Sequence, residues 1–104
     1  MISRTLIRDL SALPNGEMVT VSGWVDTVRD QKKVQFVILQ DESGAVQLVN
    51  PAARPEDKAE QASPEALART ETISSLTAGS MISVRGILAH DERVKLGGLE
   101  VQIS

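Results

Sequence analysis

The sequence predicts a small, mostly β barrel of five strands, with one or two short helices between the third and fourth strands. Three observations lead to this fold class. Several short runs alternate apolar and polar residues, the period of a half-buried strand. Gly, Pro, Asn and Asp separate these runs, and the stretch 51–76 changes to an Ala-, Glu- and Pro-rich composition. With 104 residues, 41% of them hydrophobic, we expect one compact domain, 1–104; a domain of this size buries about 60–70% of its unfolded surface.

The first three predicted strands form a meander. A short entry segment and a Pro-Asn-Gly turn at 14–16 lead into the first strand, from about 17 to 28. Gly23 within it predicts a bulge or a sharp bend, as a strongly coiled barrel strand requires. The second strand spans about 33–41 and the third about 44–50. Gly44, in the turn between them, is expected to supply a positive φ for a tight hairpin.

The segment 51–76 contains two predicted helix starts. Pro55 is followed by two acidic residues, and Ser63 precedes Pro64, the arrangement of an N-cap and a first helical position. One or two short helices are therefore expected here. Their predicted inward-facing anchors are Leu67 and Ile73.

Two more strands complete the predicted barrel. They span about 81–88 and 99–103, with a turn at 90–93 between them. Three strands, a helix and two strands in this length is the order of an OB-fold, a five-stranded Greek-key barrel whose second and third strands carry the ligand face. An SH3-like barrel and a split α+β sheet are the alternative architectures.

Two residues are expected on the outer face of the sheet, where core packing does not require them. In the second strand the period of two sends Val37 and Leu39 to one face and Phe36 to the other, and in the third strand it turns Gln47 outward. A flat ring beside an amide that both donates and accepts hydrogen bonds suits an unpaired nucleic-acid base. The alternative is that Phe36 packs in the core or on the sheet and that Gln47 meets only water.

Composition excludes several classes of function. A net charge of −3 argues against strong non-specific binding to duplex DNA, although local contacts can still hold a few nucleotides. The chain has no Cys and one His, so it lacks thiolate zinc sites, cysteine nucleophiles and an imidazole pair. It has neither the apolar region of a signal peptide nor a membrane-length apolar run. We therefore expect a soluble, cytoplasmic protein without a membrane partner.

Basic residues gather in two predicted turns. Arg29, Lys32 and Lys33 lie in the first, and Arg93 and Lys95 in the second. Lys32 and Lys33 are candidates for contacts with backbone phosphate, and the alternative is an exposed hairpin tip in which lysine serves solubility.

Other polar and aromatic residues have simpler interpretations. Trp24, beside Gly23, is interpreted as a packing residue at the end of the barrel, with base stacking as the alternative. Asp26, Asp30 and His90 are interpreted as turn or loop residues rather than catalytic groups.

The order of several short motifs resembles that of a known family. The motifs are G-W-V at 23–25, R-D at 29–30, F-x-x-L-x-D at 36–41 and G-x-x-Q at 44–47. Over essentially the whole chain, this series resembles the N-terminal anticodon-binding domain of aspartyl-tRNA synthetases and their asparaginyl relatives. Residues 94–100 are closer to the archaeal-type and tRNA-promiscuous bacterial aspartyl enzymes, whereas 28–34 are closer to the asparaginyl ones.

The resemblance implies roles for individual residues. The aromatic residue matching Phe36 stacks on the central anticodon base, a uracil in both aspartate and asparagine tRNAs. The glutamine matching Gln47 hydrogen-bonds the edge of that base, and the arginine matching Arg29 contacts the anticodon loop. Positions that influence the neighbouring anticodon base are matched by Asp26, Gln31 and Arg93.

The chain departs from the family pattern at two positions. Gln40 stands where the family usually has an arginine that could touch phosphate or brace Asp41. Gly79 stands where a glutamate is often found, so the contact of that glutamate with the first anticodon base is not expected here.

The resemblance implies that residues 1–104 are the tRNA-recognition domain of a longer aspartyl-tRNA synthetase. Its partners would be the anticodon loop of tRNA(Asp), with tRNA(Asn) left open, and the catalytic domain of the parent protein. The chain alone is not expected to be an enzyme or to hold a cofactor, because the family places the site for ATP and Mg²⁺ in the catalytic domain. The isolated domain is expected to be a monomer and the parent a homodimer.

Two other functions fit the residues without the resemblance. One is a free-standing OB domain that binds single-stranded nucleic acid, and the other is a protein-interaction barrel without a nucleic-acid partner. The acidic balance and the scarcity of aromatic residues favour the latter.

Overall fold

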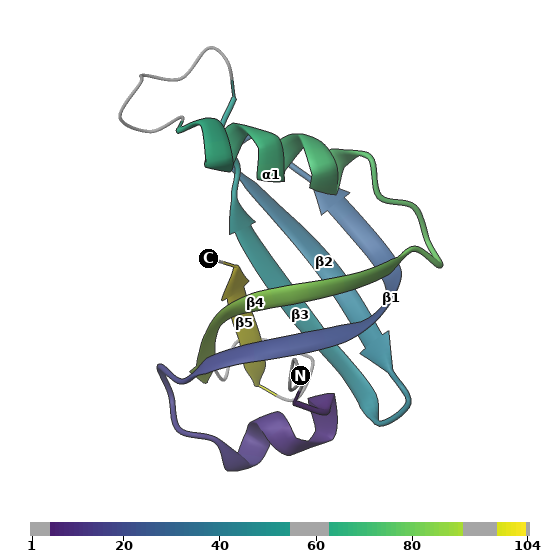
Figure 1. The fold of residues 1–104 in the computed structure, drawn as a ribbon, viewed down its shortest axis with the longest axis vertical. Helices are drawn as coiled ribbons and strands as arrows, with labels where there is room; N and C mark the ends of the chain where they lie inside the picture. Colours follow the sequence, from purple (N-terminus) through teal and green to yellow (C-terminus); the bar gives the residue numbers. More distant parts are fainter. Residues whose placement is uncertain (1–4, 55–62, 91–97, 104) are drawn as a thin grey trace.

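A closed barrel of five strands forms the body of the molecule in the computed structural model, which describes residues 5–54, 63–90 and 98–103 (Figure 1). The strands are β1 (Met18–Asp30), β2 (Val34–Asp41), β3 (Gly44–Pro51), β4 (Met81–His90) and β5 (Leu99–Ile103). Their order around the barrel is β1-β2-β3-β5-β4. Among these strand pairs, β3 and β5 are parallel and the others are antiparallel. The predicted OB-fold is confirmed.

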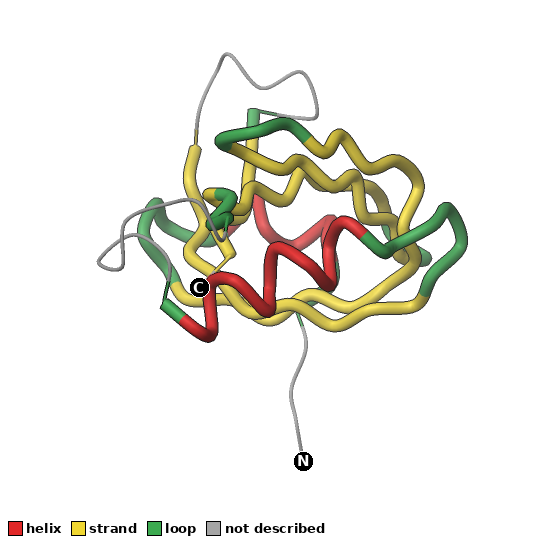
Figure 2. Tube along the Cα trace, turned by 90° about the horizontal axis from the view of Figure 1, so that it is seen from above, coloured by secondary structure: helices red, strands yellow, loops and turns green. Residues whose placement is uncertain are grey.

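Two helices lie at opposite ends of this barrel. The 3-10 helix η1 (Ile7–Ala12) precedes β1, and helix α1 (Pro64–Ser74) lies between β3 and β4 in the chain. Figure 2 shows α1 lying across one end of the barrel. The predicted N-cap is confirmed, because the Ser63 hydroxyl accepts a hydrogen bond from the Ala66 N–H at 3.2 Å and Pro64 begins the helix. The helix start predicted at Pro55 lies outside the described residues.

Strand β1 is shared between two neighbours. Its first half pairs with β4 and its second half with β2, and Trp24 has a partner in both ladders. Gly23 lies directly before this change of partner, and a Cβ there would come within 1.9 Å of the Gln40 carbonyl oxygen. Gly23 therefore allows two strands to approach closely, while the bulge itself lies between Val25 and Thr27.

The core follows the predicted alternation. In β2, Val37 and Leu39 are buried while Phe36 is half-buried. In α1, Ile73 is buried as predicted, but Leu67 is only half-buried. The buried residues that form the apolar cluster are Ile7, Leu10, Val19, Val21, Val25, Val37, Leu39, Val46, Leu48, Ile73, Leu88 and Val101.

The turn between β2 and β3 differs from the prediction. Gly44 does not have a positive φ, so the expected reason for a glycine here was wrong. The turn is held by the Asp41 carboxylate, whose Oδ1 accepts hydrogen bonds from the Ser43 N–H (2.7 Å), the Ser43 hydroxyl (2.6 Å) and the Gly44 N–H (3.1 Å). Its Oδ2 accepts from the Ile7 N–H at 2.9 Å, which joins the turn to η1.

A buried polar network joins α1 to the barrel. The Gln35 side chain is fully buried, and its amide nitrogen donates to the Thr70 carbonyl (3.0 Å) and the Ser74 hydroxyl (3.0 Å). Its oxygen accepts from the Asn50 amide at 2.9 Å. Among the described residues, no buried side-chain nitrogen or oxygen is left without a partner. The network therefore satisfies the polar groups that α1 covers.

Candidate nucleic-acid interface

The outer face of β1, β2 and β3 carries the residues predicted to meet a base. Strand register places Arg29, Phe36 and Val49 directly opposite one another in one row across this face. The next row contains Ile38 and Gln47, which are also direct partners. Phe36 and Gln47 are therefore diagonal neighbours, about 7–8 Å apart in a typical sheet and within reach of long side chains.

Phe36 does not belong to the core. It is half-buried, and it is found neither in the apolar cluster nor among the partly buried apolar side chains packed against that cluster. Its ring stands over the sheet beside the exposed Arg29. The interpretation of Phe36 as a core residue is therefore wrong, and its ring lies on the predicted outer face.

Gln47 lies on the same outer face as Phe36. Gln47 is half-buried, and within the described parts of the chain its side chain makes no hydrogen bond. Its neighbour across the parallel ladder is Glu100. Because the amide can donate and accept at once, Gln47 can match both a donor and an acceptor on the edge of a base.

Arg54 holds the turn that joins β1 to β2. Its Nη2 donates to Asp30 Oδ1 (2.8 Å) and the Gln31 carbonyl (2.9 Å), and its Nε donates to the Lys32 carbonyl at 3.4 Å. The Ser74 hydroxyl, followed by Arg54, lowers the pKa of Asp30 by hydrogen bonding to its carboxylate. Asp30 is the last residue of β1 and pairs with Gln35, so its prediction as a turn or loop residue was wrong, and its carboxylate braces the turn that follows the strand.

The remaining predicted site residues fall in three places. Gln31 and Lys33 are exposed in the turn that Arg54 holds, next to the row of Arg29. Asp26 is exposed at the bulge of β1, where its carboxylate accepts a hydrogen bond from the Thr27 hydroxyl at 3.0 Å. Arg93 lies outside the described residues.

Both departures from the family pattern have a structural explanation. The side-chain oxygen of Gln40 accepts a hydrogen bond from the Trp24 indole N–H at 3.1 Å, which an arginine could not do. Gly79 has a φ of +93°, and its N–H donates to the Val25 carbonyl at 2.7 Å. Glycine therefore suits this turn, because a side chain at that φ would be strained.

Trp24 is more exposed than predicted. Its side chain is one of the exposed large apolar groups of the molecule, with 37% of the residue surface accessible. The interpretation of Trp24 as a packing residue at the barrel end is corrected by this exposure. Trp24 lies between the buried Gly23 and Val25 of β1, so the alternation of the strand turns its indole away from the core.

These features define an OB-fold with an aromatic and polar sheet face bordered by a basic turn. The family model of the tRNA anticodon type, described as an OB-fold nucleic acid binding domain, matches residues 19–104. The chain therefore belongs to this family of OB-fold nucleic acid binding domains. None of the helices in the described parts of the chain is long and apolar enough to cross a membrane.

The curated relatives with similar sequences are aspartate–tRNA(Asp/Asn) ligases. The chain is 32% identical over 102 residues to the aspartate–tRNA(Asp/Asn) ligase of Methanopyrus kandleri, an alignment that covers 97% of this chain and 21% of that protein. It is 33% identical over 94 residues to the ligase of the same name from Helicobacter pylori, covering 89% of this chain and 15% of the relative. The chain therefore spans about a fifth or less of the curated relatives that it matches.

A solved structure of a related enzyme has the same fold over nearly all of this chain. Asparaginyl-tRNA synthetase from Pyrococcus horikoshii, in complex with asparaginyl-adenylate, superposes with a TM-score of 0.76 at 29% identity. The match covers 99% of this chain and 21% of that chain. Sequence and fold thus agree on a likeness to one domain of aspartate- and asparagine-specific ligases.

Proposed function

We propose that this chain binds the anticodon loop of tRNA(Asp) as the tRNA-recognition domain of an aspartyl-tRNA synthetase. The observation that carries the proposal is the placement of Phe36, Gln47 and Arg29 on the outer face of β1, β2 and β3 in a chain of the anticodon-binding family. The aspartate–tRNA(Asp/Asn) ligases that it resembles support the choice of tRNA.

Each of the three residues has a distinct task in this proposal. The Phe36 ring stacks on the central base of the anticodon, a uracil. The Gln47 amide bonds the edge of that base, where uracil offers a ring N–H donor between two carbonyl acceptors. Arg29, opposite Phe36 in the β1–β2 ladder, attracts the phosphate that links this base to its neighbour.

The turn held by Arg54 extends this surface. Gln31 and Lys33 would meet the backbone or the neighbouring base of the loop, and Asp26 and Arg93 are proposed to influence that base from the bulge and the β4–β5 connection. With a net charge of −3 on the chain, long-range attraction to RNA is weak, so short-range contacts supply most of the affinity.

The same base pocket would accept tRNA(Asn), because the two tRNAs share the central uracil. Amino-acid activation with ATP and Mg²⁺ is assigned to a catalytic domain outside residues 1–104, in keeping with the small share of the ligases that the chain matches. We propose that the isolated chain is a monomer and that the parent protein is a homodimer joined through the catalytic domain.

An NMR titration of the labelled chain with an anticodon stem-loop of tRNA(Asp) tests the proposal. We expect shifts at Arg29, Phe36 and Gln47 that diminish when the central uracil of the loop is changed to cytosine. Equal shifts with both RNAs would indicate a general single-strand binder. The absence of any shift with RNA at roughly millimolar concentration, a concentration high enough to detect even weak RNA binding, would contradict RNA binding and favour a protein-interaction barrel.

Phe36→Ala provides the matching test by mutation. Loss of a stacked base is expected to weaken binding by ~1–3 kcal/mol, while the free energy of unfolding changes little because the ring lies outside the core. Fluorescence anisotropy of a labelled stem-loop measures the affinity, and urea unfolding measures the stability. A large loss of stability with unchanged affinity would contradict the proposed role of Phe36.

A further inference from the structure

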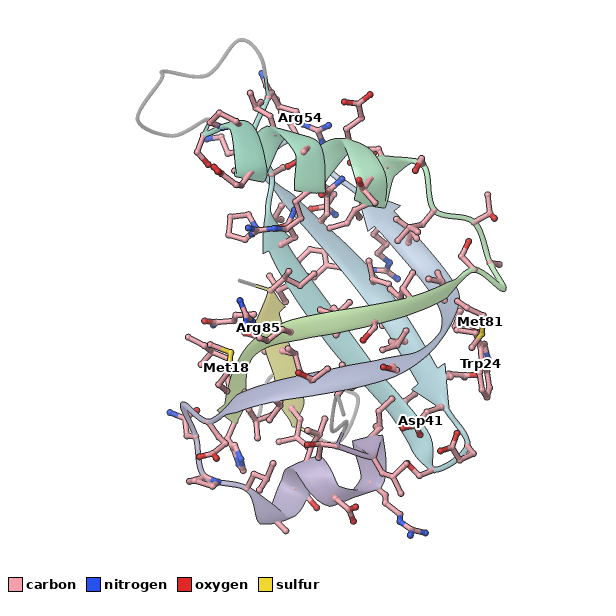
Figure 3. The ribbon with its side chains drawn as sticks, viewed as in Figure 1. Met18, Trp24, Asp41, Arg54, Met81 and Arg85 are labelled. Atoms are coloured by element: carbon pink, nitrogen blue, oxygen red, sulfur yellow. The ribbon has the colours of Figure 1, made fainter. Side chains whose placement is uncertain are left out.

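An exposed apolar pair lies outside the proposed base site. Trp24 is 37% exposed and Met81 is 74% exposed, and the two are direct partners in the β1–β4 ladder. Figure 3 shows them together at the side of the barrel, where β1 changes from one neighbour to the other. Neither side chain belongs to the apolar cluster of the core. Core packing therefore does not account for this pair.

The indole ring is held by a specific hydrogen bond. The Trp24 N–H donates to Gln40 Oε1 at 3.1 Å. An indole nitrogen can only donate, so this contact occupies the amide oxygen of Gln40 and leaves its nitrogen to donate elsewhere. Within the described parts of the chain, that nitrogen has no hydrogen-bond partner. The result is an oriented aromatic face beside an amide donor.

This group continues the proposed nucleic-acid face. Gln40 lies opposite both Trp24 and Ala45, so these three residues form the next row of the sheet after the row of Ile38 and Gln47. Gln40 lies four positions after Phe36 in β2, which corresponds to about 13 Å along a strand. That separation is too large for one base to contact both aromatic rings, so the second ring would meet a different nucleotide.

We propose that Trp24, Gln40 and Met81 form a second nucleotide site for the RNA that binds at Phe36. A base stacks on the indole, the Met81 side chain packs against its edge, and the Gln40 amide nitrogen donates to an acceptor of the base. The inference rests on the proposed function and extends it. Because every base has a π-face and an acceptor, the site adds affinity with little choice between bases.

RNA is favoured over a protein partner by two features. The combination of an aromatic ring with an adjacent amide is the same as at Phe36 and Gln47, and it lies on the same sheet face. The available amide hydrogens also match the acceptors that bases present, whereas a purely apolar protein contact would leave them unpaired.

Intrinsic fluorescence reports on this site directly, because Trp24 is the only Trp in the chain. We expect the anticodon stem-loop of tRNA(Asp) to quench this fluorescence in a saturable way, at the concentrations that shift the Phe36 resonances. Trp24→Ala is expected to weaken binding on the order of five- to a hundred-fold, measured by anisotropy of a labelled stem-loop. Trp24→Phe, which keeps a ring, should retain most of the affinity even if the alanine variant unfolds.

The chain offers a matched control on the same ladder. Met18 and Ile87 form a second exposed apolar pair, 51% and 38% exposed, at the other end of the β1–β4 ladder. Met18→Ala removes an exposed methionine without touching the proposed site, so it should bind as the unmodified chain does. Met81→Ala should lower the affinity, by less than Trp24→Ala.

The outcomes separate this inference from the proposed function. If Phe36→Ala weakens binding while Trp24 fluorescence is unchanged and Trp24→Ala binds normally, the second site is overturned and the proposed function stands. If Trp24 responds while Phe36→Ala has no effect, the second site stands and the proposed base site fails. If no RNA binds, both are overturned and the apolar pair is assigned to a protein contact.

Discussion

At the scale of single residues, the Asp41 carboxylate joins two distant parts of the chain. It closes the β2–β3 turn with one oxygen and holds the Ile7 N–H of η1 with the other. Burial alone would raise the pKa of Asp41, but the hydrogen bonds from the Ser43 hydroxyl and from three backbone N–H groups outweigh it, so the pKa lies below its ordinary value. The charged form of Asp41 therefore stabilises the fold. Figure 3 shows where Asp41 lies in the barrel.

This lowered pKa predicts a pH-dependent stability. A carboxylate whose pKa is lower in the folded state stabilises fully above its unfolded pKa of about 3.9 and loses that contribution as the pH falls through the folded value. Asp41→Asn should lower the free energy of unfolding by about 1–3 kcal/mol at neutral pH, and the gap to the unmodified chain should narrow in acid. Urea unfolding of both proteins at neutral pH and below pH ~4 measures this difference in the free energy of unfolding.

Asp9 provides a control for the loss of one acidic group. Its side chain is 59% exposed and forms an ion pair at 3.8 Å with Arg8, whose side chain is 68% exposed, so Asp9→Asn should change stability little. The free energies of unfolding of Asp41→Asn and the unmodified chain could also differ by the same amount at every pH. That result would show that Asp41 acts through its shape rather than its charge.

At the scale of elements, α1 is attached to the barrel through both an apolar anchor and a polar network. Ile73 supplies a buried apolar anchor, while Gln35 and Asn50 meet the helix through hydrogen bonds to Thr70, Ser74 and Arg69. The Thr70 hydroxyl also accepts from the Ala53 N–H at 2.9 Å, which ties the end of β3 to the helix. Arg54 follows Ala53 in the chain and holds the β1–β2 turn. The position of α1 is therefore coupled to the turn that borders the nucleic-acid face.

We predict that removing Gln35 loosens α1. Gln35→Ala leaves the Asn50 amide and the Thr70 carbonyl without their buried partner, which should cost about 1–3 kcal/mol of stability in addition to the cavity. Gln35→Met keeps most of the volume and isolates the loss of hydrogen bonds. Amide hydrogen exchange should speed up in 64–74 more than in the strands. The exposed Gln102 offers a control, and an equal effect of Gln102→Ala would contradict the argument.

At the scale of the whole molecule, the closed barrel includes a close approach of β1 and β2 at Gly23. β1 must leave β4 and join β2 within a few residues, and a Cβ at Gly23 would lie 1.9 Å from the Gln40 carbonyl oxygen of β2. A side chain at this position would force the two strands apart. Trp24, the next residue of β1, has partners in both β2 and β4, so the proposed second nucleotide site lies beside this close approach.

A pair of glycine substitutions tests this account. Gly23→Ala would place a Cβ within 1.9 Å of the Gln40 carbonyl oxygen, and we expect a loss of more than about 3 kcal/mol or failure to fold. Gly44→Ala would place its Cβ at an ordinary 3.6 Å from Ile7 in a conformation open to any residue, so a change of less than about 1 kcal/mol is expected. Urea unfolding measures the stability of both variants. Similar stabilities would contradict the close approach of the strands at Gly23.

The sequence by itself determined the order of the five strands and α1, the faces of β2 and β3 and the start of α1, but not the 3-10 helix η1, where only a short entry segment was predicted. These features depend on periods of two residues and on an N-cap, signals that are complete within a few neighbouring positions. The outward direction of Phe36 and Gln47 follows from the same local rule, which is why the centre of the candidate site could be predicted. The ordered motifs also identified the family before any contact was known.

Only the tertiary structure decided which distant groups meet. Ile7 and Asp41 are 34 residues apart, Gln35 and Thr70 are 35 apart, and Arg54 reaches back more than 20 residues to the β1–β2 turn. No local period carries this information, because each contact depends on how the barrel closes. The hydrogen bond from Trp24 to Gln40 belongs to the same class, since it joins β1 to β2 where β1 exchanges one neighbouring strand for another.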